Sequence, residues 1–166
     1  MSRILVVYFS RTGHTRTVAK QIAERLDADL EEIHDPTNRS GIFGYQRSGF
    51  QAFFRRLPPI AAAIHDPHQY DMVVIGTPVW NMSLSSPVRA YLRRYRAVLP
   101  KVGFFCTCGG AGFGRAFAQM SKECGQPPVA TMVLTERELT TAAVPIAVAR
   151  FLVHIRAAFT TARRAA

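Results

Sequence analysis

Short apolar runs alternate along this chain with segments of helical periodicity, and this alternation restricts the folds open to it. The apolar runs are Ile4–Phe9, Met72–Gly76, Val102–Thr107 and Val129–Leu134. Uninterrupted runs of this length are typical of parallel strands that are buried on both faces. The more polar Asp29–Ile33 is predicted as a further strand at a sheet edge. The order predicts an α/β fold, with a parallel five-stranded sheet covered by helices on both faces.

Five helices are predicted from spacing and end signals. They cover 15–26, 50–57, 87–99, 113–124 and 145–162. Ser86 is expected to cap the third helix with Pro87 at its first position, and Leu99 is placed on the buried stripe of that helix. Phe113 is placed on the apolar stripe of the fourth helix, and Phe159 on that of the last. Pro58 and Pro59 are expected to stop the second helix.

Composition excludes several classes of protein. A length of 166 residues suits one domain, predicted here to span residues 1–166, and 48% hydrophobic residues exclude a disordered chain. No apolar run reaches the ~18 residues that a membrane span needs. The first residues do not resemble a signal peptide, so a cytoplasmic location is expected. Three cysteines are too few for a disulfide framework.

The formal net charge is +10, and most of the excess lies in the second half of the chain. A strongly basic chain raises the question of nucleic-acid binding. No basic arm, zinc-finger spacing or RNA-binding motif is visible, and the arginines occur one by one on helical faces. We therefore expect a solvated basic surface and no nucleic-acid partner.

The segment Ser10-Arg11-Thr12-Gly13-His14-Thr15 lies between the first strand and the first helix. A helix start presents unpaired backbone N–H groups and the positive end of the helix dipole. Hydroxyl groups add donors, and a glycine allows close approach or a positive φ. These features predict a phosphate-binding loop, although a helix cap with spare Ser and Thr residues would look similar.

The same six residues match the Ser/Thr-x-Thr-Gly-x-Thr phosphate loop of the flavodoxins, and the chain resembles a short member of the flavodoxin-like family over residues 3–160. The resemblance implies a three-layer fold with strand order 2-1-3-4-5 and a bound flavin mononucleotide (FMN). Its phosphate would lie on Ser10, Thr12, Gly13, His14 and Thr15. Arg11 and His14 stand where the family commonly has uncharged residues, so each either adds charge at the phosphate or faces solvent.

A second candidate loop follows the Met72–Gly76 strand. It is formed by Thr77, Pro78, Val79, Trp80, Asn81 and Met82. An indole at the rim of a ligand crevice is a stacking platform for a flat ring, and the alternative is a tryptophan that only packs in the core. In the family this loop flanks the flavin, so the resemblance makes Trp80 the stacking residue.

A third candidate loop, rich in glycine, follows Val102–Thr107. Glycines let the backbone lie against a ligand and offer free N–H groups. In the family the matching loop covers the pyrimidine side of the flavin. The predicted contacts are Thr107, Cys108, Gly109, Gly110 and Phe113.

Other catalytic or metal sites are poorly supported. Cys106 and Cys108 face the same side of a strand, but no histidine lies near them in sequence, so no metal site is expected. No Ser–His–Asp set can be assembled, and no catalytic residue is assigned.

The charge of the three loops bears on the flavin chemistry. None of them contains Asp or Glu, whereas flavodoxins that carry single electrons are usually acidic. An anionic reduced flavin should therefore be stabilised. In addition, Asn81 stands where the family favours a glycine, whose peptide flip stabilises the neutral semiquinone. Both features favour two-electron chemistry, and abundant blue semiquinone on photoreduction would contradict this.

The leading hypothesis is an FMN-dependent oxidoreductase that uses NAD(P)H and a quinone or another small acceptor. The alternatives are a one-electron carrier flavodoxin that serves a larger redox protein, and a flavin-free binding module on the same fold. The segment 36–65, with its phenylalanines and arginines, is a candidate cover for a substrate and a candidate homodimer surface, although a plain covering helix explains it as well. The substrate stays undetermined.

Overall fold

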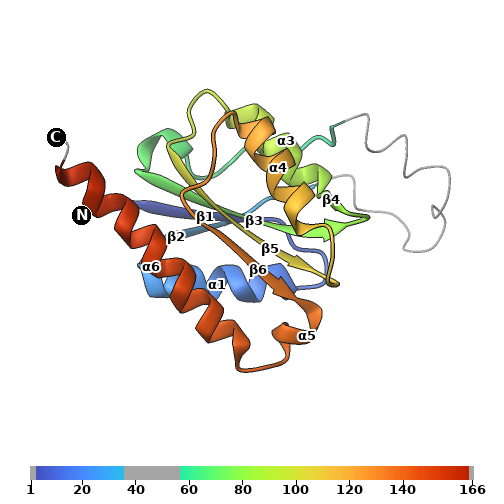
Figure 1. Ribbon diagram of the computed structural model, residues 1–166. Helices are drawn as coiled ribbons and strands as arrows, with labels where there is room; N and C mark the ends of the chain where they lie inside the picture. Colours follow the sequence, from blue (N-terminus) through green and yellow to red (C-terminus); the bar gives the residue numbers. More distant parts are fainter. Residues whose placement is uncertain (1–2, 36–56, 165–166) are drawn as a thin grey trace.

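The structure is a computed structural model that describes residues 3–35 and 57–164, with side chains as far as residue 158. Five parallel strands form the sheet between two layers of helices (Figure 1). They are β1 (Ile4–Tyr8), β2 (Asp29–Glu32), β3 (Met72–Trp80), β5 (Lys101–Cys108) and β6 (Thr131–Thr135). The order across the sheet is β2-β1-β3-β5-β6. Numbered by the parallel strands alone, this is the predicted order 2-1-3-4-5.

Burial on both faces explains the uninterrupted apolar runs. Leu5 and Val7 of β1 point into one core, while Ile4 and Val6 point into the other, as the period of two requires. Helices α3 (Ser86–Tyr95) and α4 (Phe113–Cys124) cover the first face. Helices α1 (His14–Leu26) and α6 (Ala143–Arg164) cover the other face (Figure 1). The all-buried run of β1 therefore lies in the interior of the molecule, and the half-exposed β2 lies at the edge.

Strand β3 is longer than predicted, so the second candidate loop is largely strand. Thr77 and Pro78 pair with β5, and the chain turns back only at Asn81 and Met82. Both turn residues have positive φ, +47° and +60°, which is the geometry of a two-residue type I′ hairpin. The strand that follows, β4 (Ser83–Leu84), pairs antiparallel with the end of β3 and was not predicted.

Two predicted helix ends are wrong by a short distance. The cap of α3 is Ser85, one residue before the predicted Ser86, and the helix ends before Leu99, which is nevertheless buried. In α4, Phe113 is 41% exposed and does not belong to the buried stripe. The stripe consists of Ala116, Met120 and Cys124.

The C-terminal part adds one short helix that was not predicted. Helix α5 (Glu136–Leu139) is capped by Thr135, whose hydroxyl accepts from the Glu138 N–H while the Glu138 carboxylate accepts from Thr135. Helix α6 buries the predicted residues Val148, Phe151, Leu152 and Ile155. The Phe159 side chain lies outside the described part. None of the helices in the described part is long and apolar enough to cross a membrane.

The predictions for residues 36–56 lie outside the described residues, including the second helix and its aromatic and basic side chains. The chain from 57 to 63 carries no helix, and a single 3-10 turn, η1 (Pro67–Gln69), precedes β3. Ile60 and Ala63 pack against the core on the face of the sheet that α3 and α4 cover.

Candidate functional site

Three segments that are distant in sequence lie at one edge of the sheet. They follow β1, β3 and β5, which are parallel neighbours, so their carboxyl ends lie at the same edge (Figure 1). The strand order reverses direction at β1, which pairs with β2 on one side and with β3 on the other. Crevices at such a switch point are where open α/β sheets bind ligands.

The first segment begins helix α1. Gly13 is the N-cap residue with a φ of +95°, a conformation that side chains other than glycine rarely adopt. The Ser10 hydroxyl accepts a hydrogen bond from the Gly13 N–H at 3.1 Å and so folds the loop back on itself. The first turn of α1 contains no acidic residue. Its N–H groups and the dipole therefore favour an anion here.

Thr15 and Thr107 connect the first segment to the third. Their hydroxyls lie 2.8 Å apart, and both residues are buried. Thr12 and His14 of the same loop are exposed. The Thr15 hydroxyl therefore links α1 to β5, while the neighbouring polar groups of the loop face outward.

Trp80 lies at the end of β3 and is partly exposed. The Phe9 ring meets the indole edge-on, with the ring centroids 5.8 Å apart and an interplanar angle of 87°. The Arg11 guanidinium carbon lies 6.0 Å from the centroid of the indole. The first and second segments are thus in contact through the side chain that the sequence singled out.

The third segment packs on the hairpin turn. Gly112 has a φ of +86°, and a Cβ atom there would lie 2.6 Å from the Met82 Cα. Gly109 and Gly110 are exposed, so their backbone groups are open to a ligand. Phe113 and Met82, 41% and 50% exposed, stand beside them.

The structure does not bring every predicted side chain to the surface of this site. Pro78 and Val79 are buried in β3. Thr77 is fully buried, with its hydroxyl 3.0 Å from that of Ser85, so it anchors the start of α3. Cys108 is also buried. Burial raises the pKa of the neighbouring Cys106 thiol well above its usual range, which makes that thiol a poor nucleophile.

Sequence reasoning missed two contacts that shape the site. It assigned Phe9 to a buried strand without placing it on Trp80. It also gave no role to Gly112, which is the point where the third loop contacts Met82. A type I′ hairpin usually carries glycine or asparagine at its two turn positions. Only Asn81 gave that signal, since the second position is methionine.

A carboxylate on the strand next to β1 is already engaged. Glu32 at the end of β2 pairs with Arg16 at 2.7 Å and accepts a hydrogen bond from the Tyr8 hydroxyl at 3.0 Å. This pairing raises the pKa of Arg16 above its ordinary value. The loop at residues 10–15 contains no Asp or Glu of its own, so nothing within the loop offsets the charge of Arg11.

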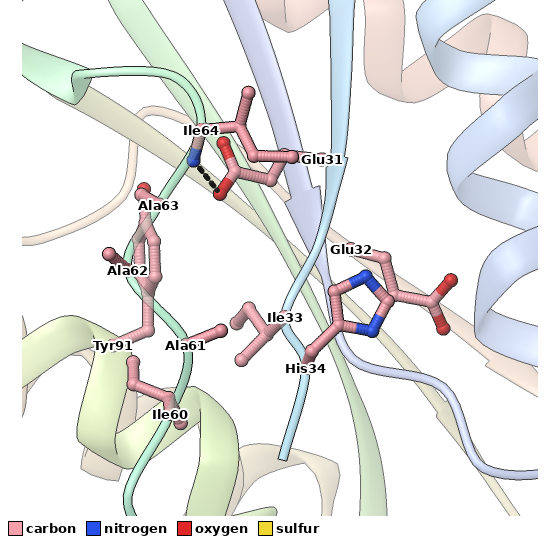
Figure 2. A pocket seen from close by; sticks show the side chains of 10 residues that line it. All are labelled: Glu31, Glu32, Ile33, His34, Ile60, Ala61, Ala62, Ala63, Ile64 and Tyr91. Carbon is pink, nitrogen blue, oxygen red and sulfur yellow. Dashed lines mark hydrogen bonds between the residues drawn. The ribbon is translucent and has the colours of Figure 1, made fainter. Parts of the chain in front are cut away.

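A separate small cavity lies between β2 and the chain at 60–64, and no residue of the three loops lines it (Figure 2). Its volume is about 20 Å³, which suits a single water molecule. The Glu31 carboxylate accepts from the N–H groups of Ile64 and His65 at 3.0 and 2.9 Å. These two hydrogen bonds attach the chain at 64–65 to β2, so we interpret the cavity as part of a structural contact. The described residues contain no group of three His, Cys, Asp or Glu side chains that could hold a metal ion.

Comparisons with known proteins agree with the fold. A quinone-type NAD(P)H dehydrogenase from Chromohalobacter salexigens is 28% identical over 102 residues, 55% of this chain and 46% of that protein. The chain thus matches less than half the length of this curated relative. A flavoprotein from Lactobacillus acidophilus, solved in complex with FMN, has a TM-score of 0.65 and 19% identity, covering 80% of this chain and 93% of that one.

A structure from Bacteroides eggerthii, described as a flavoprotein, has a TM-score of 0.73 and 22% identity, covering 92% of this chain and 99% of that one. The family model described as Flavodoxin matches residues 3–144, which include all three loops. On the strength of that match and of the strand order, the chain belongs to the flavodoxin family.

Proposed function

We propose that this chain binds FMN at the carboxyl ends of β1, β3 and β5 and uses it in two-electron oxidation–reduction. The donor is NAD(P)H, and the acceptor is a quinone or another small organic molecule. Membership of the flavodoxin family and the FMN complex of the Lactobacillus relative support the cofactor. The curated NAD(P)H dehydrogenase (quinone) supports the donor and the acceptor.

The observation that carries the proposal is the contact between the loop at the start of α1 and Trp80. A phosphate group fits the αL-capped start of α1, where Gly13 permits close approach and no acidic side chain opposes it. A flat ring fits beside the partly exposed indole, 6.0 Å from Arg11. One ligand that carries both groups would bridge the two loops.

Each part of the site then has a role. Ser10, Thr12 and His14 bind the phosphate with the Gly13 and helix N–H groups, and Trp80 stacks on the ring. Exposed Gly109 and Gly110 offer backbone donors to the edge of the ring. The buried Thr15–Thr107 hydrogen bond fixes the spacing between the first and third loops. FMN itself supplies the acceptor for a hydride.

Local charge supports the two-electron reaction. The three loops contain no carboxylate, and Arg11 lies beside the stacking residue. A positive environment stabilises the negative charge that the fully reduced flavin carries. Each 1.4 kcal/mol of such stabilisation raises a two-electron potential by about 30 mV.

The absorption spectrum of the purified protein tests the cofactor, followed by heat release and identification of any bound flavin. We expect a flavin spectrum near that of free FMN, or tight uptake of added FMN by the colourless protein. NADPH oxidation with a benzoquinone acceptor then tests the activity. Failure to bind FMN at high excess overturns the whole proposal, and binding without NADPH oxidation overturns the enzymatic part.

One observation favours a carrier role instead. Met82 and Phe113 expose large apolar side chains next to the site, and such side chains suit docking to another protein. Photoreduction of the FMN-loaded protein at neutral pH separates the two functions. A carrier accumulates the one-electron form, whereas the proposed oxidoreductase passes to the two-electron form with little of it.

A further inference from the structure

We propose that Arg11 is a positioning residue for the indole of Trp80, so that the phosphate loop itself sets the orientation of the ring on which the flavin stacks. The indole contact stands on the geometry alone, and its consequence for flavin binding rests on the function proposed above. The sequence had left two roles for Arg11, a phosphate ligand or a solvated side chain. The structure adds a third role.

The indole is held by two side chains of one short segment. Phe9 and Arg11 are two residues apart, and both contact Trp80, the first edge-on at 5.8 Å and the second over the ring at 6.0 Å. A guanidinium at this distance from an indole makes a cation–π contact. The orientation of Trp80 therefore depends on how the chain leaves β1.

The indole of Trp80 is the group that the Arg11 guanidinium contacts, and no ion pair in the described part of the chain competes for it. Among the described residues, no carboxylate lies within ion-pair distance of Arg11. Arg16, in the first turn of α1, is instead bound to Glu32 at 2.7 Å. Both arginines are exposed, so the difference between them lies in the partner that each one contacts.

Strand pairing fixes the backbone of Trp80, whereas the orientation of its indole depends on side-chain contacts. Trp80 pairs with Ser83 across the type I′ turn, which holds its Cα in the sheet. The side chain is partly exposed. A contact that selects one orientation of such a side chain removes an ordering cost from flavin binding.

Two variants of Arg11 separate the positioning role from simple attraction to phosphate. Arg11→Gln removes the charge and the planar group, while Arg11→Lys keeps the charge but replaces the planar guanidinium with a compact ammonium. Lys20→Gln is the matched control, since it removes one positive charge from the exposed side of α1, the helix that follows the loop of Arg11. Riboflavin, which lacks the phosphate, is the matched ligand for FMN.

The first measurement uses the apoprotein. Trp80 is the only tryptophan of the chain, so intrinsic fluorescence reports on it alone. We expect acrylamide quenching of Trp80 to increase in both Arg11 variants and to stay unchanged in Lys20→Gln. Unchanged quenching in Arg11→Gln overturns the indole contact, whatever the protein binds.

The second measurement is the affinity for FMN and for riboflavin. We expect Arg11→Gln to weaken both ligands by the same factor, about two- to fivefold, the range of an exposed cation–π contact. A loss confined to FMN overturns the positioning role and assigns Arg11 to the phosphate. If neither ligand binds the parent protein, the proposed function fails, while the quenching result still decides the contact between Arg11 and Trp80.

Discussion

The hydrogen bond between Thr15 of α1 and Thr107 of β5 joins residues that are 92 positions apart, and valine substitutions test how much it contributes to stability. Valine keeps the shape of threonine and removes the hydroxyl. Each single substitution leaves the other hydroxyl buried without its partner, which costs about 1–3 kcal/mol. The double substitution removes both hydroxyls and leaves no polar group unpaired. We therefore expect the double variant to be less destabilised than the sum of the two single variants.

A working estimate follows from these values. With about 1.5 kcal/mol for each single substitution, the sum is about 3 kcal/mol, whereas the double substitution costs about 1 kcal/mol. The coupling energy between Thr15 and Thr107 is then about 2 kcal/mol. The free energy of unfolding is measured for the apoprotein and the three variants by urea denaturation, followed by circular dichroism.

The control for this cycle is Thr17→Val on the same helix. Thr17 is exposed and donates to the Gly13 carbonyl at 3.1 Å, so water replaces the lost bond and the change stays within about 0.5 kcal/mol. A double variant whose loss equals the sum of the single losses would refute the reasoning, because it would show that the hydroxyls act independently. FMN affinity is measured on the same proteins, and we expect the single variants to bind less tightly than the parent.

Three further predictions concern stability. Gly112→Ala places a Cβ atom 2.6 Å from the Met82 Cα at a φ of +86°. We therefore expect the free energy of unfolding in urea to fall by about 2 kcal/mol and FMN to bind more weakly. A decrease below about 0.5 kcal/mol would show that the loop moves to accommodate the methyl group at little cost. Glu31→Gln removes the charged acceptor of two backbone N–H groups, so we expect the free energy of unfolding to fall by about 2 kcal/mol. An unchanged urea midpoint would show that these two hydrogen bonds do not stabilise the fold. The Arg93 guanidinium lowers the pKa of Glu123, so the stability from this pair is present above the pKa of the unfolded carboxyl and is lost as the pH falls through the lower folded value. Urea midpoints from pH 6 to pH 3 should therefore fall less steeply in Glu123→Gln than in the parent protein, and equal slopes would argue against the shift.

The strands and the first loop could be predicted from the sequence, because both depend on local patterns. The strand order 2-1-3-4-5 came from the resemblance to the flavodoxins, since local patterns do not fix which strands pair. Uninterrupted apolar runs marked the strands that are buried on both faces. Both ends of β1 and of β5 lie within one residue of the predicted bounds. The glycine of the first loop marked a positive φ, which Gly13 adopts. These features need no knowledge of distant residues.

The end of β3 could not be predicted in the same way. The predicted strand ends at Gly76, and Pro78, which lacks an N–H group, is unusual in a central strand. Pairing with β5 extends it to Trp80 nevertheless. The turn at Asn81 and Met82 was hidden because methionine rarely adopts a positive φ. Met82 packs against Gly112 and adopts a positive φ, although the backbone preference of methionine disfavours it.

The side-chain contacts of the site were also beyond the sequence. Thr15 and Thr107 were both chosen as ligand contacts, yet nothing in either segment indicates that they bond to each other. The same holds for Arg11 and Trp80. Such pairs depend on how the strands are placed side by side, and only the assembled sheet shows them.

The arrangement of the three loops on neighbouring strands has a consequence for folding. Residues 10–15, 80–82 and 107–113 come together only when β1, β3 and β5 are paired, so no fragment that lacks one of these strands carries a complete pocket. A ligand held by all three loops therefore stabilises the chain against global unfolding rather than against local fraying. Hydrogen exchange of the innermost amides should slow by the same factor as the unfolding equilibrium when the ligand is added.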